Sequence, residues 1–397
     1  MKNQGILKIK QLLEKGVKIS NPGSIEIDDE VVLDRISGEG VVIYSGSKIF
    51  GSSTLILQGA KIGYEGPVTI DNCQIGPDVE LKAGFFKEAV FLKKVSIGSG
   101  AQVRAGTILE EGATAGHTVG LKQTILFPFV TLGSLINFCD CFMSGGTSQK
   151  NHSEVGSSYI HFNYTPNQDK ATASLIGDVP RGVMLNQKPI FLGGQGGLVG
   201  PCRLEFGTII AAGSIQRKDE LRPGRLIAER IGEGINTAYP SENYLNFKRI
   251  IKNNIIYIAN LRTLMQWYIH VRSQFISDEF PEELFDGLKE KLNMAIEERI
   301  KRLKEYYFKI RMVKKQKDDS ENKWPELEES LAQINGLEGD PKLRDTFLEK
   351  IHSSMNKAGK DYITVIKGLT IEDAETGTMW LQGIVDQIIE KTIKIIT

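Results

Sequence analysis

Residues 96–127 read SIGSGAQVRAGTILEEGATAGHTVGLKQTILF, and an apolar or small residue recurs there at every sixth position. The recurring residues are Ile97, Val103, Leu109, Ala115, Leu121 and Phe127. An amphipathic helix would repeat about every 3.6 residues and a half-buried strand about every 2 residues, so neither explains this period. The spacing indicates instead a structural repeat that stacks on itself along the chain.

The same six-residue step appears on both sides of this stretch. Ile75 and Leu81 precede it, and a second run follows at Leu192, Leu198, Leu204 and Ile210. This spacing predicts a left-handed parallel β-helix, in which each short strand forms one face of a triangular coil and inward residues stack on the coil below. At about 18 residues per coil, residues 24–228 allow on the order of ten coils. The spacing breaks at residues 84–94 and 137–190, where we expect loops to project.

The composition changes toward the C-terminus. Most of the 41 glycines lie before Gly234, and from Tyr239 onward apolar residues fall at helical spacing. We expect helices over residues 239–275, 281–313, 325–335, 341–356 and 371–396, with an exposed connection at 314–322. The predicted β + α organisation is an N-terminal helix or lead-in over residues 1–20, the β-helix over residues 21–228 and an α-helical domain over residues 229–397.

Charge and cysteine content narrow the class of protein. The 49 Lys and Arg residues balance 49 Asp and Glu residues, so no net field favours nucleic acid as a partner. No apolar stretch has the length of a signal peptide or of a membrane span. The four cysteines are too few for a disulfide framework, and Cys139-Asp140-Cys141 lacks the spacing of a zinc knuckle. We therefore expect a cytoplasmic protein with reduced thiols.

Four ordered blocks between residues 12 and 215 resemble one family. The blocks are Leu12-Leu13-Glu14-Lys15-Gly16-Val17 with Pro22 and Ile27-Asp28; Asn137-Phe138 with Lys150-Asn151-His152; Asn163-Tyr164 with Lys170 and Ile176-Gly177-Asp178; and residues 191–201 with Ala211-Ala212-Gly213-Ser214. They are similar to the acetyltransferase half of the bifunctional bacterial enzyme that acetylates glucosamine-1-phosphate and then uridylylates it. No Gly-rich loop after an N-terminal strand is available to hold a nucleoside triphosphate, so we expect the uridylyl-transfer activity to be missing.

This resemblance implies an acyltransferase of the hexapeptide-repeat superfamily. Its donor would be acetyl-coenzyme A, and its acceptor an amino-sugar phosphate or a nucleotide sugar of the UDP-N-acetylglucosamine kind. The resemblance also implies a homotrimer in which residues from two neighbouring subunits build each site. No metal is expected for acyl transfer.

The resemblance assigns the catalytic base to His152, the histidine of the second block. An imidazole suits this role because it titrates near neutral pH without special tuning. His161 is a rival base, since it stands where the family has no histidine. Lys150 and His161 are also candidates for contacts with the substrate.

Lys170 resembles the lysine that holds the sugar phosphate, while Asn163 and Tyr164 offer amide and phenol groups for sugar hydroxyls. The acetyl-coenzyme A wall of the family is matched by Gly193, Gly194, Ala211, Ala212 and Ser214, and Arg217 and Lys218 just beyond it could meet the phosphates of the cofactor. Plainer interpretations stay open: a solvated lysine, a packing tyrosine, glycines that form corners and a basic rim of the solenoid.

Departures from the family pattern leave a second function open. The family places an arginine one coil before its Asn-Phe pair and a lysine shortly after it, whereas only Lys122 lies upstream here and no cation follows before Lys150. Residues 179–189 are an insertion. The alternative is a non-catalytic relative that binds a nucleotide sugar or acts as a trimeric scaffold. A metal site at His117, His152 and His161 would lack compact ligand spacing.

Overall fold

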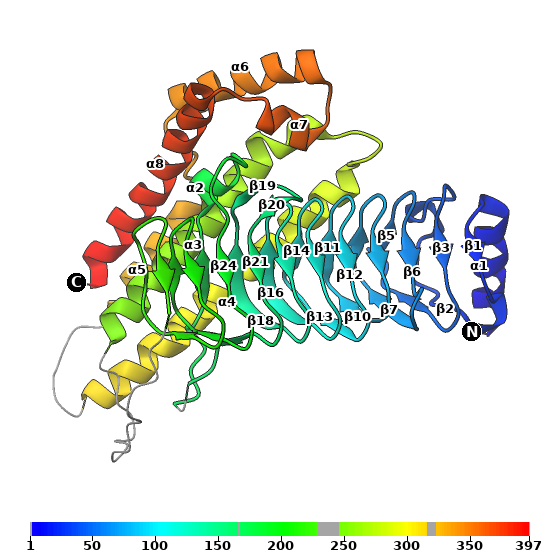
Figure 1. Ribbon diagram of the computed structural model, residues 1–397, viewed down its shortest axis with the longest axis horizontal. Helices are drawn as coiled ribbons and strands as arrows, with labels where there is room; N and C mark the ends of the chain where they lie inside the picture. Colours follow the sequence, from blue (N-terminus) through cyan, green and yellow to red (C-terminus); the bar gives the residue numbers. More distant parts are fainter. Residues whose placement is uncertain (1, 166, 229–245, 316–322, 397) are drawn as a thin grey trace.

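The computed structural model describes residues 2–165, 167–228, 246–315 and 323–396. Helix α1 (Lys2–Lys15) packs across the N-terminal end of a long parallel β-solenoid (Figure 1). α1 buries Ile9 and Leu12, which cover the apolar end of the first coil. Two short 3₁₀ helices, η1 (Pro22–Ser24) and η2 (Leu33–Arg35), lie in the first coils.

The solenoid has three faces, each a ladder of short parallel strands. Face 1 contains β1 (Lys18–Ile19), β3 (Val42–Ile43), β6 (Lys61–Ile62), β9 (Glu80–Leu81), β12 (Ser96–Ile97), β15 (Thr114–Ala115), β17 (Thr131–Leu132), β21 (Glu154–Val155), β24 (Phe191–Leu192), β27 (Ile209–Ile210) and β29 (Leu226–Ile227). Face 2 contains β2 (Glu26–Ile27), β4 (Lys48–Phe50), β7 (Val68–Asp71), β10 (Gly84–Lys87), β13 (Ala101–Val103), the first part of β16 (Gly120–Leu126), the first part of β18 (Asn137–Met143), β22 (Ile160–Phe162), β25 (Gly197–Val199) and β28 (Ile215–Gln216).

Face 3 contains β5 (Leu55–Ile56), β8 (Gln74–Ile75), β11 (Ala89–Phe91), β14 (Thr107–Leu109), the last parts of β16 and β18, β23 (Ser174–Ile176) and β26 (Arg203–Leu204). β16 and β18 each continue around a corner, because each pairs with a face 2 strand at its start and with a face 3 strand at its end. The predicted parallel β-helix is confirmed, with about 11 turns.

The six-residue period places its residues inside the coils. Ile97 stacks on Ala115 and Ala115 on Leu132, all buried. Phe127 is an exception: Leu126, five residues after Leu121, occupies the position that stacks on Leu109. Phe127 is nevertheless buried at the next corner.

The prediction of a projecting loop at residues 84–94 is wrong. β10 and β11 occupy this stretch, and Phe86 pairs with Ile70 in the coil before and with Val103 in the coil after. This coil is shorter than its neighbours, so the spacing breaks without any projection. Within residues 137–190 the expected projections are present: a hairpin of β19 (Gly146–Ser148) and β20 (Asn151–His152), the loop 163–173 and the short helix α2 (Val179–Gly182).

The C-terminal region is helical, as predicted. It contains α3 (Phe247–His270), η3 (Arg272–Phe275), α4 (Glu282–Lys315), α5 (Trp324–Gln333), η4 (Ile334–Gly336), α6 (Pro341–Ala358), α7 (Tyr362–Lys367) and α8 (Ile371–Ile396). The start of the first predicted helix and most of the predicted connection at 314–322 lie outside the described residues.

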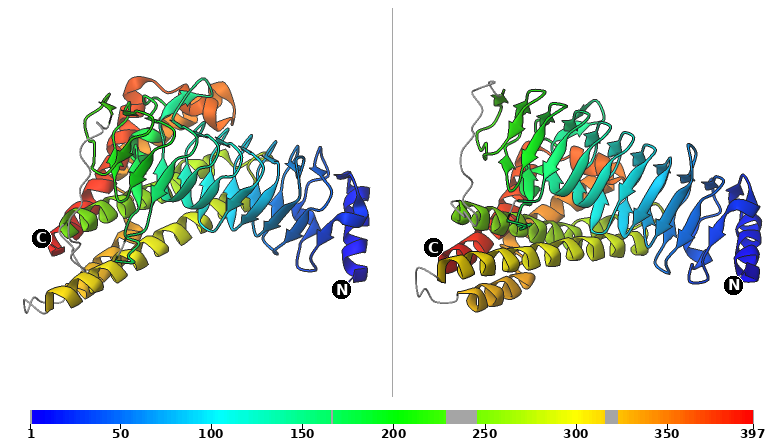
Figure 2. Two further views of the ribbon diagram at one scale, coloured as in Figure 1. Left: turned by 60° about the horizontal axis from the view of Figure 1, so that its bottom comes forward. Right: turned by 90° about the horizontal axis from the view of Figure 1, so that it is seen from below.

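The helices fold back along the solenoid. α4 contacts β8, β11 and β14, and α3 contacts β23, so together they cover face 3 (Figures 1 and 2). The approach is close, since a Cβ added at Gly287 would lie 2.8 Å from the Gln74 side chain. A larger residue at position 287 would require the Gln74 side chain or α4 to shift.

Buried polar contacts join the two regions. Arg299 of α4 lies 2.6 Å from Asp140 of β18, and the Tyr268 hydroxyl donates to Glu110 at 2.6 Å. Apolar side chains from both regions form one continuous core. None of the helices, over the residues described, is both long and apolar enough to cross a membrane.

Candidate active site

The candidate site residues lie at or beside the three corners of the solenoid, except His161, which lies in the face 2 strand β22. The corners are named by the faces they join, in chain direction: face 1–2, face 2–3 and face 3–1. Corners suit function because their side chains point outward from a rigid stack.

His152 lies on the β19–β20 hairpin at the face 3–1 corner. Its Nδ1 lies 2.7 Å from the backbone oxygen of Gln149, and a carbonyl oxygen can only accept, so Nδ1 carries the proton of the neutral ring. The lone pair is then on Nε2, which lies 3.8 Å from a carboxylate oxygen of Glu154. The side chain is 22% exposed. This arrangement presents Nε2 as a proton acceptor.

Lys150 lies in the turn of the same hairpin, and its side chain is exposed. The hairpin is held by backbone bonds to the coil, since Gly146 N–H donates to Gln187 and Ser153 N–H donates to Gly145. His152 is therefore attached to the scaffold by a short, braced segment.

His161 lies inside the solenoid. It pairs with Leu198 in the next coil, is 1% exposed and lies edge-on to Phe138. Its Nδ1 is 2.6 Å from the Cys139 carbonyl oxygen and its Nε2 is 2.8 Å from the Ser174 hydroxyl. Both ring nitrogens are thus occupied by protein groups, which favours a structural role for this histidine.

Burial lowers the pKa of His161 to about 4 from its ordinary value of 6.5. The unfolded chain therefore takes up a proton as the pH falls below about 6.5, and the folded chain does so only near pH 4. We expect the stability that the neutral ring contributes to be complete above pH 6.5 and to decline by roughly 3 kcal/mol as the pH falls to about 4.

This decline is measured by urea unfolding at several pH values, with His161→Gln as the reference variant. Burial raises the pKa of Glu110, which works in the opposite direction over part of the same window. The difference between the two proteins isolates the histidine, and equal slopes for both would contradict the assignment.

Asn163, Tyr164 and Lys170 lie in the loop 163–173 at the face 2–3 corner. The Asn163 amide donates to Asp140 at 3.1 Å, and the Lys170 backbone oxygen accepts from Arg299 at 3.4 Å. Lys309 of α4 also donates to the loop backbone. Tyr164 and the Lys170 side chain are exposed, so α4 fixes the loop while these two groups face outward.

The residues that match the acetyl-coenzyme A wall lie at the face 1–2 corner. Here the structure brings Gly193 and the Ala211–Ala212 pair together, because a Cβ at Gly193 would lie 2.3 Å from the Ala212 nitrogen. Glycine at this position is thus required by coil stacking alone. Gly194 packs in the same way on Ser157, Ser214 is buried and Ala212 is exposed. Arg217 and Lys218 are exposed too, but they follow the face 2 strand β28 and therefore lie at the face 2–3 corner.

One chain does not bring the three groups of residues together. His152 is at the face 3–1 corner, Lys170 at the face 2–3 corner and Gly193 at the face 1–2 corner. They can meet only if corners of neighbouring subunits face one another.

Sequence reasoning missed two features. The first is a surface hollow on face 2 that Lys122 shares with Lys87 and Arg104. Arg104 and Lys122 lie 18 residues apart, about one coil, and this step could have indicated that they are neighbours. Arg272, which contacts the solenoid from the helical region, had no signal, because its surroundings come from segments far apart in sequence. No cluster of three or more His, Cys, Asp or Glu side chains suited to a metal occurs among the described residues.

Comparison with known proteins finds relatives for about half of the chain. It is 29% identical over 213 residues to the bifunctional protein GlmU of Thermotoga maritima, covering 53% of this chain and 42% of that protein. Identity to the GlmU protein of Pelobacter propionicus is 28% over 211 residues (53% and 40%), and to that of Syntrophomonas wolfei 26% over 226 residues (57% and 44%). No protein-family model matches.

The chain therefore spans less than half the length of these curated relatives. The matches and the solenoid confirm the resemblance predicted from the four sequence blocks: about half of the chain is similar to GlmU proteins, and its β-solenoid is consistent with a hexapeptide-repeat acetyltransferase domain.

Proposed function

We propose that this relative of GlmU proteins is a cytoplasmic, acetyl-coenzyme A-dependent acyltransferase whose acceptor is an amino-sugar phosphate or a nucleotide sugar. The proposal rests on the geometry of His152, which lies on a solenoid that is similar to GlmU proteins. With Nδ1 held by a carbonyl oxygen, Nε2 is the ring nitrogen left to accept a proton, which suits a general base.

In the proposed reaction, the acceptor amine attacks the thioester carbonyl of acetyl-coenzyme A. His152 Nε2 takes the proton that the amine loses, the new C–N bond forms, and the C–S bond breaks. The proton then passes from Nε2 to the departing thiolate, which releases coenzyme A as the free thiol. Lys170 would hold the acceptor phosphate, with Asn163 and Tyr164 near the sugar hydroxyls. Lys150 would contribute charge beside the base.

The acetyl-coenzyme A donor would lie along the face 1–2 corner. Gly193, Gly194, Ala211, Ala212 and Ser214 present little side-chain bulk, which lets backbone amides approach a pantetheine arm. Arg217 and Lys218 would meet the phosphates of the donor. Because these residues and His152 lie at different corners, the proposal requires a homotrimer.

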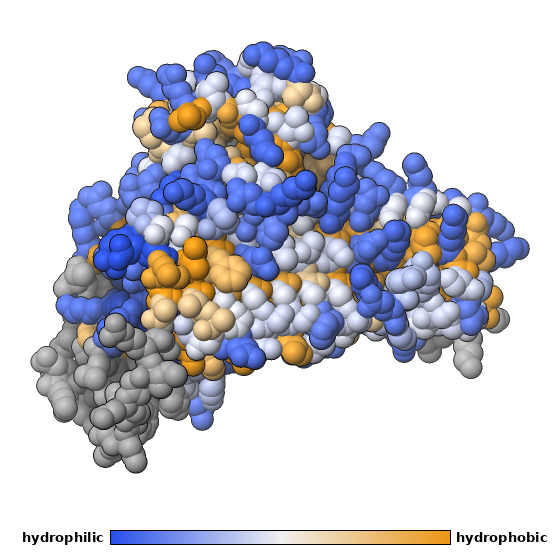
Figure 3. Space-filling view, in the orientation of Figure 1, coloured by the Kyte–Doolittle hydropathy of each residue, from blue (hydrophilic) through white to orange (hydrophobic). Residues whose placement is uncertain are grey.

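An exposed apolar ladder on face 1 supports self-association. Phe191, Ile209 and Leu226 occupy the same register position in successive coils and are 40%, 45% and 72% exposed. Figure 3 shows apolar surface gathered over these last coils. Ladders of outward apolar residues are a common feature of subunit interfaces. Face 3 is covered by helices, which leaves faces 1 and 2 for neighbouring subunits.

We expect the double variant Phe191→Glu and Ile209→Glu to be monomeric, since two carboxylates per subunit would be buried in the proposed interface. Light scattering should give about three times the chain mass of 44.1 kDa for the wild type and about one chain mass for the variant. Ile371→Glu changes an apolar residue on α8 that is more exposed, at 78%, and should leave the trimer intact. A wild-type monomer at micromolar concentration would rule the trimer out.

Acetyl transfer is tested with purified protein, acetyl-coenzyme A and glucosamine-1-phosphate, with release of free thiol as the readout. We expect thiol release that depends on the acceptor. The alternative is a non-catalytic, nucleotide-sugar-binding relative or trimeric scaffold. One observation favours it: the cations Lys87, Arg104 and Lys122 line a hollow on face 2 that does not include Lys170. Binding of UDP-N-acetylglucosamine without turnover of any acceptor would support that alternative.

A further inference from the structure

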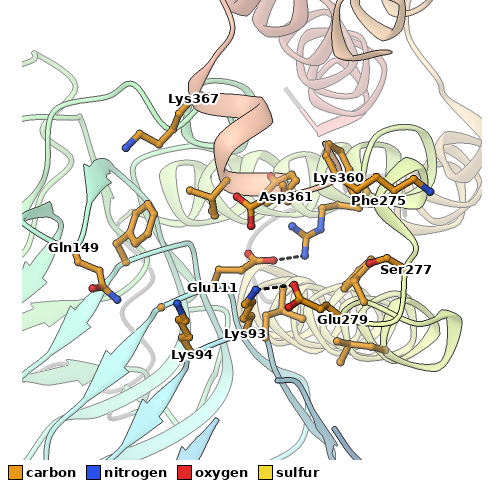
Figure 4. A pocket seen from close by; sticks show the side chains of 18 of the residues that line it. Lys93, Lys94, Glu111, Gln149, Phe275, Ser277, Glu279, Lys360, Asp361 and Lys367 are labelled. Atoms are coloured by element: carbon orange, nitrogen blue, oxygen red, sulfur yellow. Dashed lines mark hydrogen bonds and ion pairs between the residues drawn. The ribbon is translucent and has the colours of Figure 1, made fainter. Parts of the chain in front are cut away.

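A cavity of about 430 Å³ lies between the face 3–1 corner and the helical region (Figure 4). The solenoid contributes Lys93, Lys94, Glu111 and Phe129, and the hairpin contributes Ser148 and Gln149. The helical region contributes the segment 272–284 and α7 with the residues before it. The volume is in the range of small-molecule sites, roughly 300–1,000 Å³.

Arg272 is the most unusual group in this cavity. It is 1% exposed, its Nη2 donates to Glu111 at 2.6 Å, and its guanidinium carbon lies 3.8 Å from the Tyr362 ring centroid. Its Nε and Nη1 have no hydrogen-bond acceptor among the described residues. Buried N–H groups are nearly always hydrogen-bonded. These two groups therefore need an acceptor that the described residues do not supply.

The cavity also has an excess of positive charge. Five cationic side chains line it against three carboxylates. Lys93 is paired with Glu279 at 2.6 Å, and the Lys360 ammonium donates to the Ile276 carbonyl. Lys94 and Lys367 have no ion-pair partner in the part of the chain that the structure describes. Figure 4 shows Lys94 on the solenoid side and Lys367 on the opposite side, on α7.

Aromatic side chains complete the walls. The rings are Phe129, Phe275, Phe280 and Tyr362. All four are largely buried, and the Arg272 guanidinium lies over the Phe280 and Tyr362 rings. Phe129 and Phe275 are therefore the rings that offer apolar surface to a ligand. A site with cations beside aromatic rings suits a molecule that combines phosphate with a planar ring.

We propose that this cavity binds a nucleoside diphosphate. Its phosphates would lie between Lys94, Lys367 and the unsatisfied N–H groups of Arg272, because guanidinium and ammonium groups are the usual phosphate ligands. The base would lie against the aromatic wall. The site adjoins the hairpin that carries His152, since Gln149 lines the cavity and its carbonyl oxygen contacts His152, but none of the side chains assigned to acetyl transfer lines it. The proposed binding does not depend on that function.

Binding is tested by isothermal titration of the full chain with ADP, UDP and inorganic pyrophosphate. We expect the two nucleotides to bind more tightly than pyrophosphate, with affinity that falls as salt rises. Lys94→Gln and Lys367→Gln should each weaken nucleotide binding about tenfold, and the double variant about 100-fold. Lys357→Gln is the matched control, since this exposed lysine on α6 does not line the cavity.

Both lysines are exposed, so we expect the variants to fold, and thermal unfolding that matches the wild type verifies this. No binding of ADP or UDP to the wild type would overturn the proposal. So would unchanged affinity in the double variant. Pyrophosphate that binds as tightly as the nucleotides would overturn the contact between base and aromatic wall. None of these results depends on whether the chain transfers acetyl groups.

Discussion

Replacing His152 by alanine is expected to lower kcat for acetyl transfer by roughly 100- to 10,000-fold, the usual contribution of a general base. The reason is local: Nε2 is the unprotonated nitrogen of a ring whose Nδ1 is committed to the Gln149 carbonyl oxygen. Acetyl-coenzyme A binding should change little, because the residues assigned to the donor lie at another corner. Thiol release under saturating donor and acceptor measures kcat, and titration calorimetry measures donor binding.

Two variants control this experiment. His352→Ala removes an exposed histidine of α6 whose Nε2 lies 3.2 Å from Gln274, and it should leave kcat unchanged. His152→Gln keeps a polar side chain that can still donate to the Gln149 carbonyl, so it separates loss of the base from disturbance of the hairpin. Turnover of His152→Ala within threefold of the wild type would remove this histidine from the mechanism.

The six-residue period predicted the solenoid because one inward residue per face must stack on the coil below, whatever the outward residues are. The period was less informative where coils change length. Leu126 replaces Phe127 in the stack after a five-residue step, and the coil that carries Phe86 is short without forming a loop. A shortened coil and an inserted loop both interrupt the spacing, and only coordinates distinguish them.

The two histidines show that spacing alone was also insufficient to predict the candidate site. His161 occupies the inward column that contains Leu121, Phe138 and Leu198. The hairpin that carries His152 lengthens the chain between Phe138 and His161, which hid this register in the sequence. A resemblance to known blocks could nominate both histidines. Their difference arises from burial and from the partners of each ring nitrogen.

The return of the helices along face 3 was beyond sequence reasoning for a different reason. Helical periodicity located the helices but says nothing about which surface they cover. The contacts that decide this are single pairs between remote residues, such as Arg299 with Asp140 and Tyr268 with Glu110. Neither member of such a pair stands out in its own segment.

The Arg299–Asp140 pair leads to the second large expected effect. Arg299 is 2% exposed and Asp140 is 6% exposed, with 2.6 Å between guanidinium and carboxylate. Arg299→Met would leave Asp140 buried with, among the described residues, the Asn163 amide as its one side-chain donor. We expect the free energy of unfolding to fall by about 3–5 kcal/mol, the usual cost of an unpaired buried charge. Urea unfolding followed by far-UV circular dichroism measures the loss.

The double variant Arg299→Met and Asp140→Asn should recover much of this stability, because the penalty comes from the orphaned carboxylate. Lys304→Met, on the same helix as Arg299, is the matched control. It breaks a pair with Glu328 of α5 whose side chains are 43% and 49% exposed, and it should cost less than about 1 kcal/mol. If Arg299→Met cost no more than Lys304→Met, the pair would not hold α4 on face 3. The fixed position of the loop with Asn163 and Lys170 would then need another cause, since Arg299 also donates to the Lys170 carbonyl.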